Sequence, residues 1–140
     1  MKAISHRGNL KGEKTPLENS PDYIIEAINR GFDVEVDVWF TDGLCFGHDK
    51  PEHKCSMNFL VGNSDKLWIH CKNLAALQML NGIPSLNIFW HEQDDFTLTS
   101  KGFIWTYPDK EVCSNSVIVV DDATKYNGKK CYGLCSDNVI

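Results

Sequence analysis

The run Asp33-Val34-Glu35-Val36-Asp37-Val38 constrains the fold most, because acidic and apolar residues alternate along it. Such alternation is typical of a β-strand, in which successive side chains point to opposite faces of the sheet. Glu35 and Asp37 therefore share one face and the valines share the other. Two carboxylates on one face repel each other, and burying them unpaired is unfavourable. We expect a divalent cation, or a salt bridge from Arg7 or Lys72, to balance the pair.

Further strand-like runs recur along the chain, so the fold class is α/β. Eight such runs are expected as strands: Lys2 to Ser5, Phe32 to Phe40, Leu44 to Phe46, Leu67 to Cys71, Leu86 to Trp90, Gly102 to Thr106, Ser116 to Val120 and Cys131 to Cys135. Helical spacing and end signals predict helices only at Pro21 to Arg30 and Leu74 to Leu80. The later connections, Asp94 to Ser100, Pro108 to Asn115 and Asp121 to Lys130, are expected as loops or single turns.

Histidines follow two of these expected strands. His6 precedes Arg7 at the end of the first strand, and His48 stands between Gly47 and Asp49. An imidazole has an unperturbed pKa of about 6.5, so it can give or take a proton near neutral pH. A histidine pair beside a cation bound by Glu35 and Asp37 indicates phosphate-ester chemistry at a metal.

These residues stand in the order of a known family. The motifs His6-Arg7-Gly8, Glu18-Asn19, Glu35-x-Asp37, Thr41-Asp42-Gly43 and His48-Asp49 resemble those of the glycerophosphodiester phosphodiesterase family, within the phospholipase C-like phosphodiesterases. Trp105-Thr106 and Gly133 to Asp137 are similar to two later strands of the family, more loosely. The resemblance implies a (β/α)8 barrel of the TIM type in which His6 and His48 transfer protons. It also implies that Glu35 and Asp37 bind one divalent ion, and that Arg7, Lys72, Trp105 and Asp137 bind phosphate or substrate.

The chain departs from the family in the fourth strand of the barrel, where the family carries a further acid. His70 stands at that position, and Lys72 matches the family lysine. We expect His70 to be a third metal ligand; the alternative is that it only hydrogen-bonds Glu35. The ion is expected to be Mg²⁺, Ca²⁺ or Mn²⁺, and an imidazole ligand also admits Zn²⁺. His91 and Glu92 follow the next strand, where they are either substrate-recognition residues or part of an ordinary loop.

The chain is short for the implied fold. Its 140 residues form a single domain, whereas a (β/α)8 barrel typically takes about 250 residues. We therefore expect a reduced barrel with most outer helices shortened or missing. The exposed outer face of its second half is rich in aromatic residues, so association of copies into a homo-oligomer is expected to cover it. Only Lys50 to Lys66 stands where the family has a segment over the glycerol group, so glycerol specificity does not carry over.

Composition narrows the partners. A net charge of −5 without a basic cluster argues against nucleic acid. No secretory leader or membrane span is recognisable, so a cytoplasmic location with six reduced cysteines is expected. A pairing of Cys45 with Cys55, similar to the loop disulfide of sphingomyelinase D-like enzymes, is not expected there.

The activity expected is cleavage of a small phosphodiester. Water as the nucleophile gives hydrolysis, and a neighbouring substrate hydroxyl gives a cyclic phosphate. The alternative is a non-catalytic module that binds phosphate and metal on the same fold, favoured by the missing third acid.

Overall fold

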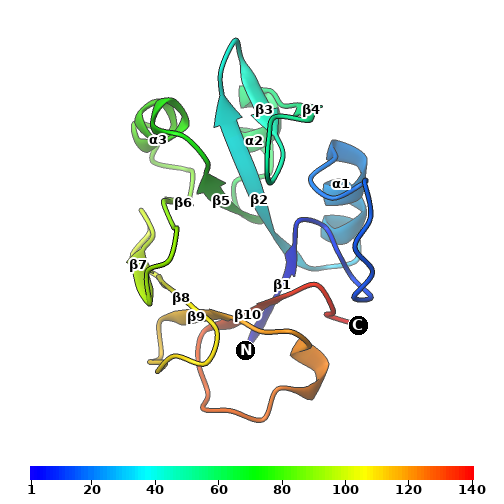
Figure 1. The fold of residues 1–140 in the computed structure, drawn as a ribbon, viewed down its shortest axis with the longest axis vertical. Helices are drawn as coiled ribbons and strands as arrows, with labels where there is room; N and C mark the ends of the chain where they lie inside the picture. The colour runs from blue at the N-terminus through cyan, green and yellow to red at the C-terminus, as the bar shows by residue number, and fades with distance from the viewer.

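The computed structural model describes residues 1–140 as one curled, mixed sheet with few helices (Figure 1). Its parallel strands run in the order β6 (Ile88–Phe89), β5 (Leu67–Cys71), β2 (Asp33–Phe40), β1 (Lys2–His6), β10 (Gly133–Ser136), β9 (Ser116–Val119) and β8 (Ile104–Thr106). The first and last strands of the chain are thus neighbours, as in a barrel.

A reduced barrel was expected, but the sheet does not close, so the structure is an open, curled sheet. β7 (Phe96–Leu98) pairs antiparallel with β8, and no ladder joins it to β6. Residues 90–95 connect β6 to β7, and a parallel crossover needs a dozen or more residues. The chain therefore turns back, and Asp94 to Ser100 contains a strand that we expected as a loop. Single contacts bridge the opening, such as the hydrogen bond from the Ser100 N–H to the Ile88 carbonyl oxygen.

A hairpin extends β2 beyond the curled sheet. β3 (Leu44–Phe46), expected as a barrel strand, pairs antiparallel with the end of β2, and β4 (His53–Lys54) pairs with β3. β4 is too short to give a period-2 pattern in the sequence. The hairpin brings Gly47 and His48 back to the end of β2, since the Gly47 N–H donates to the Asp37 carbonyl oxygen.

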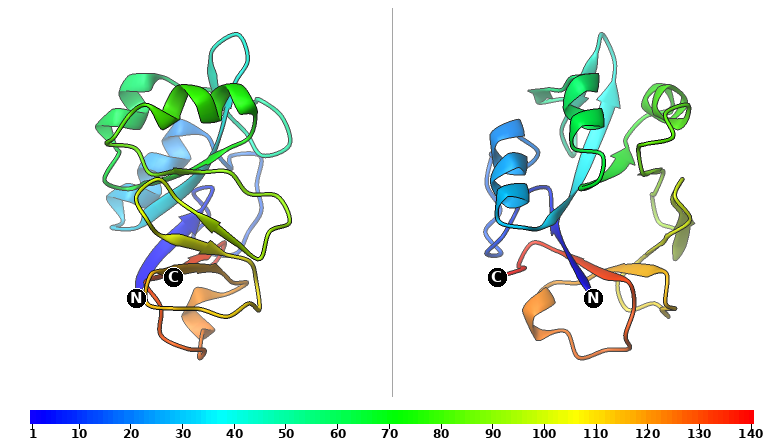
Figure 2. Two further views of the ribbon diagram at one scale, coloured as in Figure 1. Left: turned by 90° about the vertical axis from the view of Figure 1, so that its left-hand side faces the viewer. Right: turned by 180° about the vertical axis from the view of Figure 1, so that it is seen from behind.

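Helices cover only one half of the sheet (Figure 2). α1 (Pro21–Asn29) and α3 (Leu74–Asn81) match the two expected helices, and α2 (Met57–Gly62) was not expected. Its signal is the N-cap Ser56, whose hydroxyl accepts from the Phe59 N–H at 3.0 Å. From β7 to β10 the only helical segment is a 3₁₀ turn at Ala123–Lys125. The expected loss of outer helices in this half is therefore confirmed.

The valine face of β2 is the core face, and this orients its acids. Val34, Val36 and Val38 are fully buried in a cluster that includes Ile24 and Ala27 of α1, Leu60 of α2, and Ala76 and Leu80 of α3. Burial of one such aliphatic side chain contributes about 1.5–3 kcal/mol. A one-residue shift of register would expose the valines, so packing holds Glu35 and Asp37 on the inner face.

Apolar side chains fill the inside of the curled sheet next to Glu35 and Asp37. A second cluster, made of Ile4, Trp68, Phe89, Trp105, Val117 and Cys135, occupies the interior of the curled sheet. Trp105 stacks on Phe89, with ring centroids 4.5 Å apart. The interior is therefore a packed core. At the amino end of β2 the buried Asp33 accepts a hydrogen bond from Trp68 Nε1 at 3.0 Å, and the polar groups that line the pocket lie at the carboxyl ends of the strands.

The outer face of the second half leaves apolar side chains in solvent. Phe96 is 50% and Leu98 70% exposed, both on β7. The homo-oligomer stays a prediction. No helix is long and apolar enough to cross a membrane, and all six cysteines are free thiols.

Candidate active site

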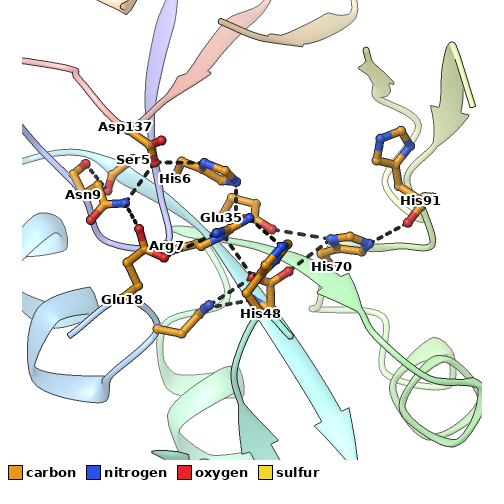
Figure 3. Close-up of polar contacts among 12 residues, drawn as sticks. Ser5, His6, Arg7, Asn9, Glu18, Glu35, His48, His70, His91 and Asp137 are labelled. Atoms are coloured by element: carbon orange, nitrogen blue, oxygen red, sulfur yellow. Dashed lines mark hydrogen bonds and ion pairs between the residues drawn. The ribbon is translucent and has the colours of Figure 1, made fainter. Parts of the chain in front are cut away.

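Most of the expected site residues line one pocket of about 540 Å³ at the carboxyl ends of the strands. They are His6, Arg7, Glu35, His48, His70, Lys72 and Trp105. Asp37 contacts Arg7 and His48, and Asp137 contacts His6 (Figure 3). A slightly larger recess of about 610 Å³ lies beside Pro108 to Val112, but no histidine lines it. The chemistry-bearing residues therefore converge on the smaller pocket.

Glu35 and Asp37, two of the three acids of β2, are removed from solvent. Glu35 is 2% and Asp37 1% exposed, and Glu35 Oε2 and Asp37 Oδ1 accept no hydrogen bond. Burial and the charge of Asp37 raise the pKa of Glu35. For Asp37, burial alone would raise the pKa, but contacts from His48 and His70 hold it below its usual range. A bound cation or a proton would therefore stabilise this buried carboxylate pair.

His70 aims a nitrogen at this pair. Register places it beside Asp37, and its Nδ1 lies 3.1 Å from Asp37 Oδ1 and 3.8 Å from Glu35 Oε1. Its Nε2 lies 2.9 Å from the His91 carbonyl oxygen, which can only accept, so Nε2 carries a proton. Nδ1 then either bears a second proton or presents its lone pair to a cation.

These three residues fit a divalent ion. One ligand atom from each of Glu35, Asp37 and His70 lies within 4.8 Å of the others. Buried carboxylate oxygens without partners and a lone pair turned toward them form a donor set that suits Mn²⁺ or Zn²⁺ as well as Mg²⁺.

Cationic side chains also reach Asp37, so the expected salt bridge is present beside this donor set. Arg7 Nε lies 3.3 Å from Asp37 Oδ2, and Lys72 Nζ lies 3.9 Å from Asp37 Oδ1. Glu18 fixes the far end of Arg7 at 3.3 Å. Glu35 receives no such contact from Arg or Lys; His6 Nε2 at 3.7 Å and His70 Nδ1 at 3.8 Å are its ionisable neighbours of opposite sign.

Asn19 holds Asp37, a role that the sequence reasoning missed. Its Nδ2 donates to Asp37 Oδ2 at 3.0 Å, and its Oδ1 accepts from the Asp37 N–H at 2.9 Å. Asn19 adopts φ 63°, a conformation that asparagine tolerates better than most residues. Its place in the Glu18-Asn19 motif was the available signal.

Asp137 contacts His6, and its expected role in binding substrate stays a prediction. Its Oδ1 lies 2.9 Å from His6 Nδ1 and accepts from Asn9 Nδ2 at 2.9 Å. Asn9 also donates to Glu18. The Nδ1 proton of His6 is thereby fixed toward Asp137, and Nε2 faces the pocket 3.7 Å from Glu35.

His48 contacts both Asp37 and Arg7. Its Nδ1 is 3.4 Å from Asp37 Oδ2, and its Nε2 is 3.3 Å from the Arg7 guanidinium. The ring is 40% exposed. A side chain on Gly47 would overlap the carbonyl oxygen of Lys50, so the turn that presents His48 requires glycine.

The His6–Asp137 pair should make stability depend on pH. Burial alone would raise the pKa of Asp137, but hydrogen bonds from His6 and Asn9 lower it to about 2. For His6, burial alone would lower the pKa, but Asp137 and Glu35 raise it. The pair should stabilise the metal-free protein by about 1–2 kcal/mol between about pH 4 and pH 6.5. The gain is lost as Asp137 protonates toward about pH 2, and as His6 deprotonates above its raised pKa.

Urea unfolding of wild type and Asp137→Asn across this range measures the effect. The difference in the free energy of unfolding should be largest between about pH 4 and pH 6.5. A difference that does not vary with pH would mean that the pair is uncharged.

Comparison with known proteins adds no relative: no family model, curated protein or solved structure matches the chain. Membership of the glycerophosphodiester phosphodiesterase family therefore stays a prediction from the motifs.

Proposed function

We propose that this chain is a metal-dependent phosphodiesterase that cleaves a small phosphodiester by proton transfer through His6 and His48. The observation that carries the proposal is the convergence on one pocket of a buried acid pair, a third donor aimed at it, and His6 with an Asp137-fixed tautomer. Asp137 holds the Nδ1 proton of His6, which leaves Nε2 turned to the pocket to give or take a proton.

Glu35, Asp37 and His70 would hold the metal, which when bound polarises the phosphate and balances developing negative charge. Arg7 and Lys72 would bind phosphate oxygens, since their donors lie at the edge of the same donor set. His6 would give or take a proton at Nε2, with Asp137 holding the ring in place. His48 would act on the other side; it becomes available when Arg7 exchanges its contact with His48 Nε2 for one with phosphate.

The substrate would be a glycerophosphodiester-like or other small phosphodiester, in line with the motif resemblance. A hydroxyl next to the ester would favour a cyclic phosphate as first product, and water would give the monoester. Residues Lys50 to Lys66 hold only β4 and α2, so no long segment closes over the pocket.

The binding-module alternative is favoured by one observation: both ring nitrogens of His48 contact protein groups, Asp37 and Arg7. Incubation with bis-p-nitrophenyl phosphate, glycerophosphocholine and a ribose-containing diester, each with Mg²⁺, Mn²⁺, Ca²⁺ and Zn²⁺, separates the two. Phosphorus NMR of the products distinguishes monoester from cyclic phosphate. Metal-dependent turnover of any diester supports the enzyme. Its absence with every metal supports the binding module, provided that the assay covers about pH 5–9, the range in which histidine side chains change protonation.

Replacement of His70 by Asp should change metal preference. An oxygen ligand in place of imidazole should raise the affinity for Mg²⁺ relative to Zn²⁺ by about 10-fold or more. Titration calorimetry of His70→Asp, with His53→Asp as control, measures the ratio. An unchanged ratio would mean that His70 is not a ligand of the metal.

A further inference from the structure

The side of the pocket away from the acid pair is built from rings. His91, just after β6, Trp105 in β8, and Tyr107, just after β8, line it, and we call these three residues the ring wall. The centroids of His91 and Tyr107 are 6.0 Å apart, and those of His91 and His70 are 6.1 Å apart. Figure 3 shows His6 and His91 on opposite sides, with His70 between them. A phosphate near His6 and His70 would thus carry one of its alcohols toward the ring wall.

Within the ring wall, Trp105 is held in place and Tyr107 is open to solvent. Trp105 is only 3% exposed and stacks on Phe89, so it cannot swing away. Tyr107 is 43% exposed although it lines the pocket. His91 Nδ1 is buried, accepts and donates no hydrogen bond, and lies 3.6 Å from Asp94 Oδ2. An open aromatic face beside an imidazole ring is suited to a flat, polar group.

The lining argues against an acyl chain and against a small alcohol. Eight of the 12 lining residues carry an acidic, basic or imidazole group, so a lipid tail would lie beside ionisable groups and compete with their hydration. A pocket of about 540 Å³ is of the size that holds a drug-sized ligand, which is more than glycerol phosphate fills. A polar alcohol that contains a ring is compatible with both the lining and the volume of the pocket.

We propose that the phosphodiester recognised here carries a ring-bearing polar alcohol, a nucleoside or a sugar, whose ring lies against Tyr107 and His91. The phosphate part rests on the proposed function, with Arg7 and Lys72 as its partners. Tyr107 and His91 are then specificity residues, and they act on binding whether or not the diester is cleaved.

Titration calorimetry of the full chain with Mn²⁺ tests this with three monophosphates: uridine 5′-monophosphate, glucose 6-phosphate and glycerol 3-phosphate. Stacking on one aromatic residue is worth about 10-fold in affinity. At least one ring compound should bind about 10-fold more tightly than glycerol 3-phosphate. Tighter binding of uridine 5′-monophosphate would identify a nucleobase as the ring, and tighter binding of glucose 6-phosphate would identify a sugar. Either result supports the proposal.

Matched variants locate the effect. Tyr107→Ala should remove the preference for the ring compound while leaving glycerol 3-phosphate binding unchanged, and Tyr107→Phe should keep it. His91→Ala should weaken the preference; Tyr126→Ala, in the other recess, and His53→Ala should not. Ring preference without turnover of any diester keeps this inference and removes the phosphodiesterase. Equal affinity for all three compounds, or a preference that survives Tyr107→Ala, overturns the inference and leaves the phosphodiesterase standing.

Discussion

Replacing His6 or His48 by Ala should lower the turnover of a phosphodiester by at least about 10²-fold, because a general acid or base contributes about 10²–10⁴-fold. His6 presents Nε2 to the pocket while Asp137 holds its Nδ1 proton. His48 lies on the far side of Arg7, next to the acid pair. The two imidazoles can therefore serve opposite sides of one phosphate. Initial rates with saturating metal, and circular dichroism to verify folding, measure the effect.

The matched control is His53→Ala, because His53 lies on β4 and contacts Glu52 rather than the pocket residues. Its rate should stay within about 2-fold of wild type. The pH–rate profile of wild type should be bell-shaped, since one imidazole must be neutral and the other charged. Activity that survives both His6→Ala and His48→Ala, or that falls equally in His53→Ala, would place the chemistry elsewhere.

Asp37→Asn should weaken divalent-ion binding strongly, the second large effect expected. Asp37 provides the least protonated carboxylate of the site, since contacts from His48 and His70 hold its pKa low. Its loss leaves Glu35, whose raised pKa makes it a poorer anion, and His70. Calorimetry should give one ion per wild-type chain and an affinity at least about 100-fold weaker in Asp37→Asn, since loss of only the hydrogen-bond partner of a ligand already costs up to about 100-fold.

Asp49→Asn is the control, because Asp49 is 91% exposed beside His48 and is not part of the donor set. A ligand at 100 times its dissociation constant stabilises the folded state by about 2.7 kcal/mol. The unfolding temperature of wild type and Asp49→Asn should therefore rise with Mn²⁺ or Zn²⁺, and that of Asp37→Asn should not. A rise of equal size in all three proteins would mean that the ion binds at another place.

Local patterns predicted the parts of the fold that depend on a single element. The alternation in β2 predicted which face carries Glu35 and Asp37, because strand periodicity and burial of the valines act within one segment. α1 was predicted from Pro21 at its first turn and Gly31 after its end. α2 and β4 were missed because six and two residues are too few to show a period.

Contacts between distant segments lay beyond the sequence reasoning. The partner of Asp137 is His6, 131 residues away, and only the pairing of β1 with β10 brings them together. The opening between β6 and β7 depends on the short connection 90–95, which reverses the chain. Candidate residues were thus predictable one by one, whereas the hydrogen bonds that set their tautomers and roles required the fold.

The most direct measurement of the central claim is anomalous diffraction from crystals of the full chain grown with Mn²⁺ and inorganic phosphate. The account predicts one manganese peak about 2.0–2.4 Å from oxygens of Glu35 and Asp37 and from His70 Nδ1. It also predicts phosphate density against that ion and against Arg7 and Lys72, with His6 Nε2 facing it. A manganese peak elsewhere, or a pocket in which Arg7 and Lys72 still hold Asp37 with neither metal nor phosphate bound, would contradict the account.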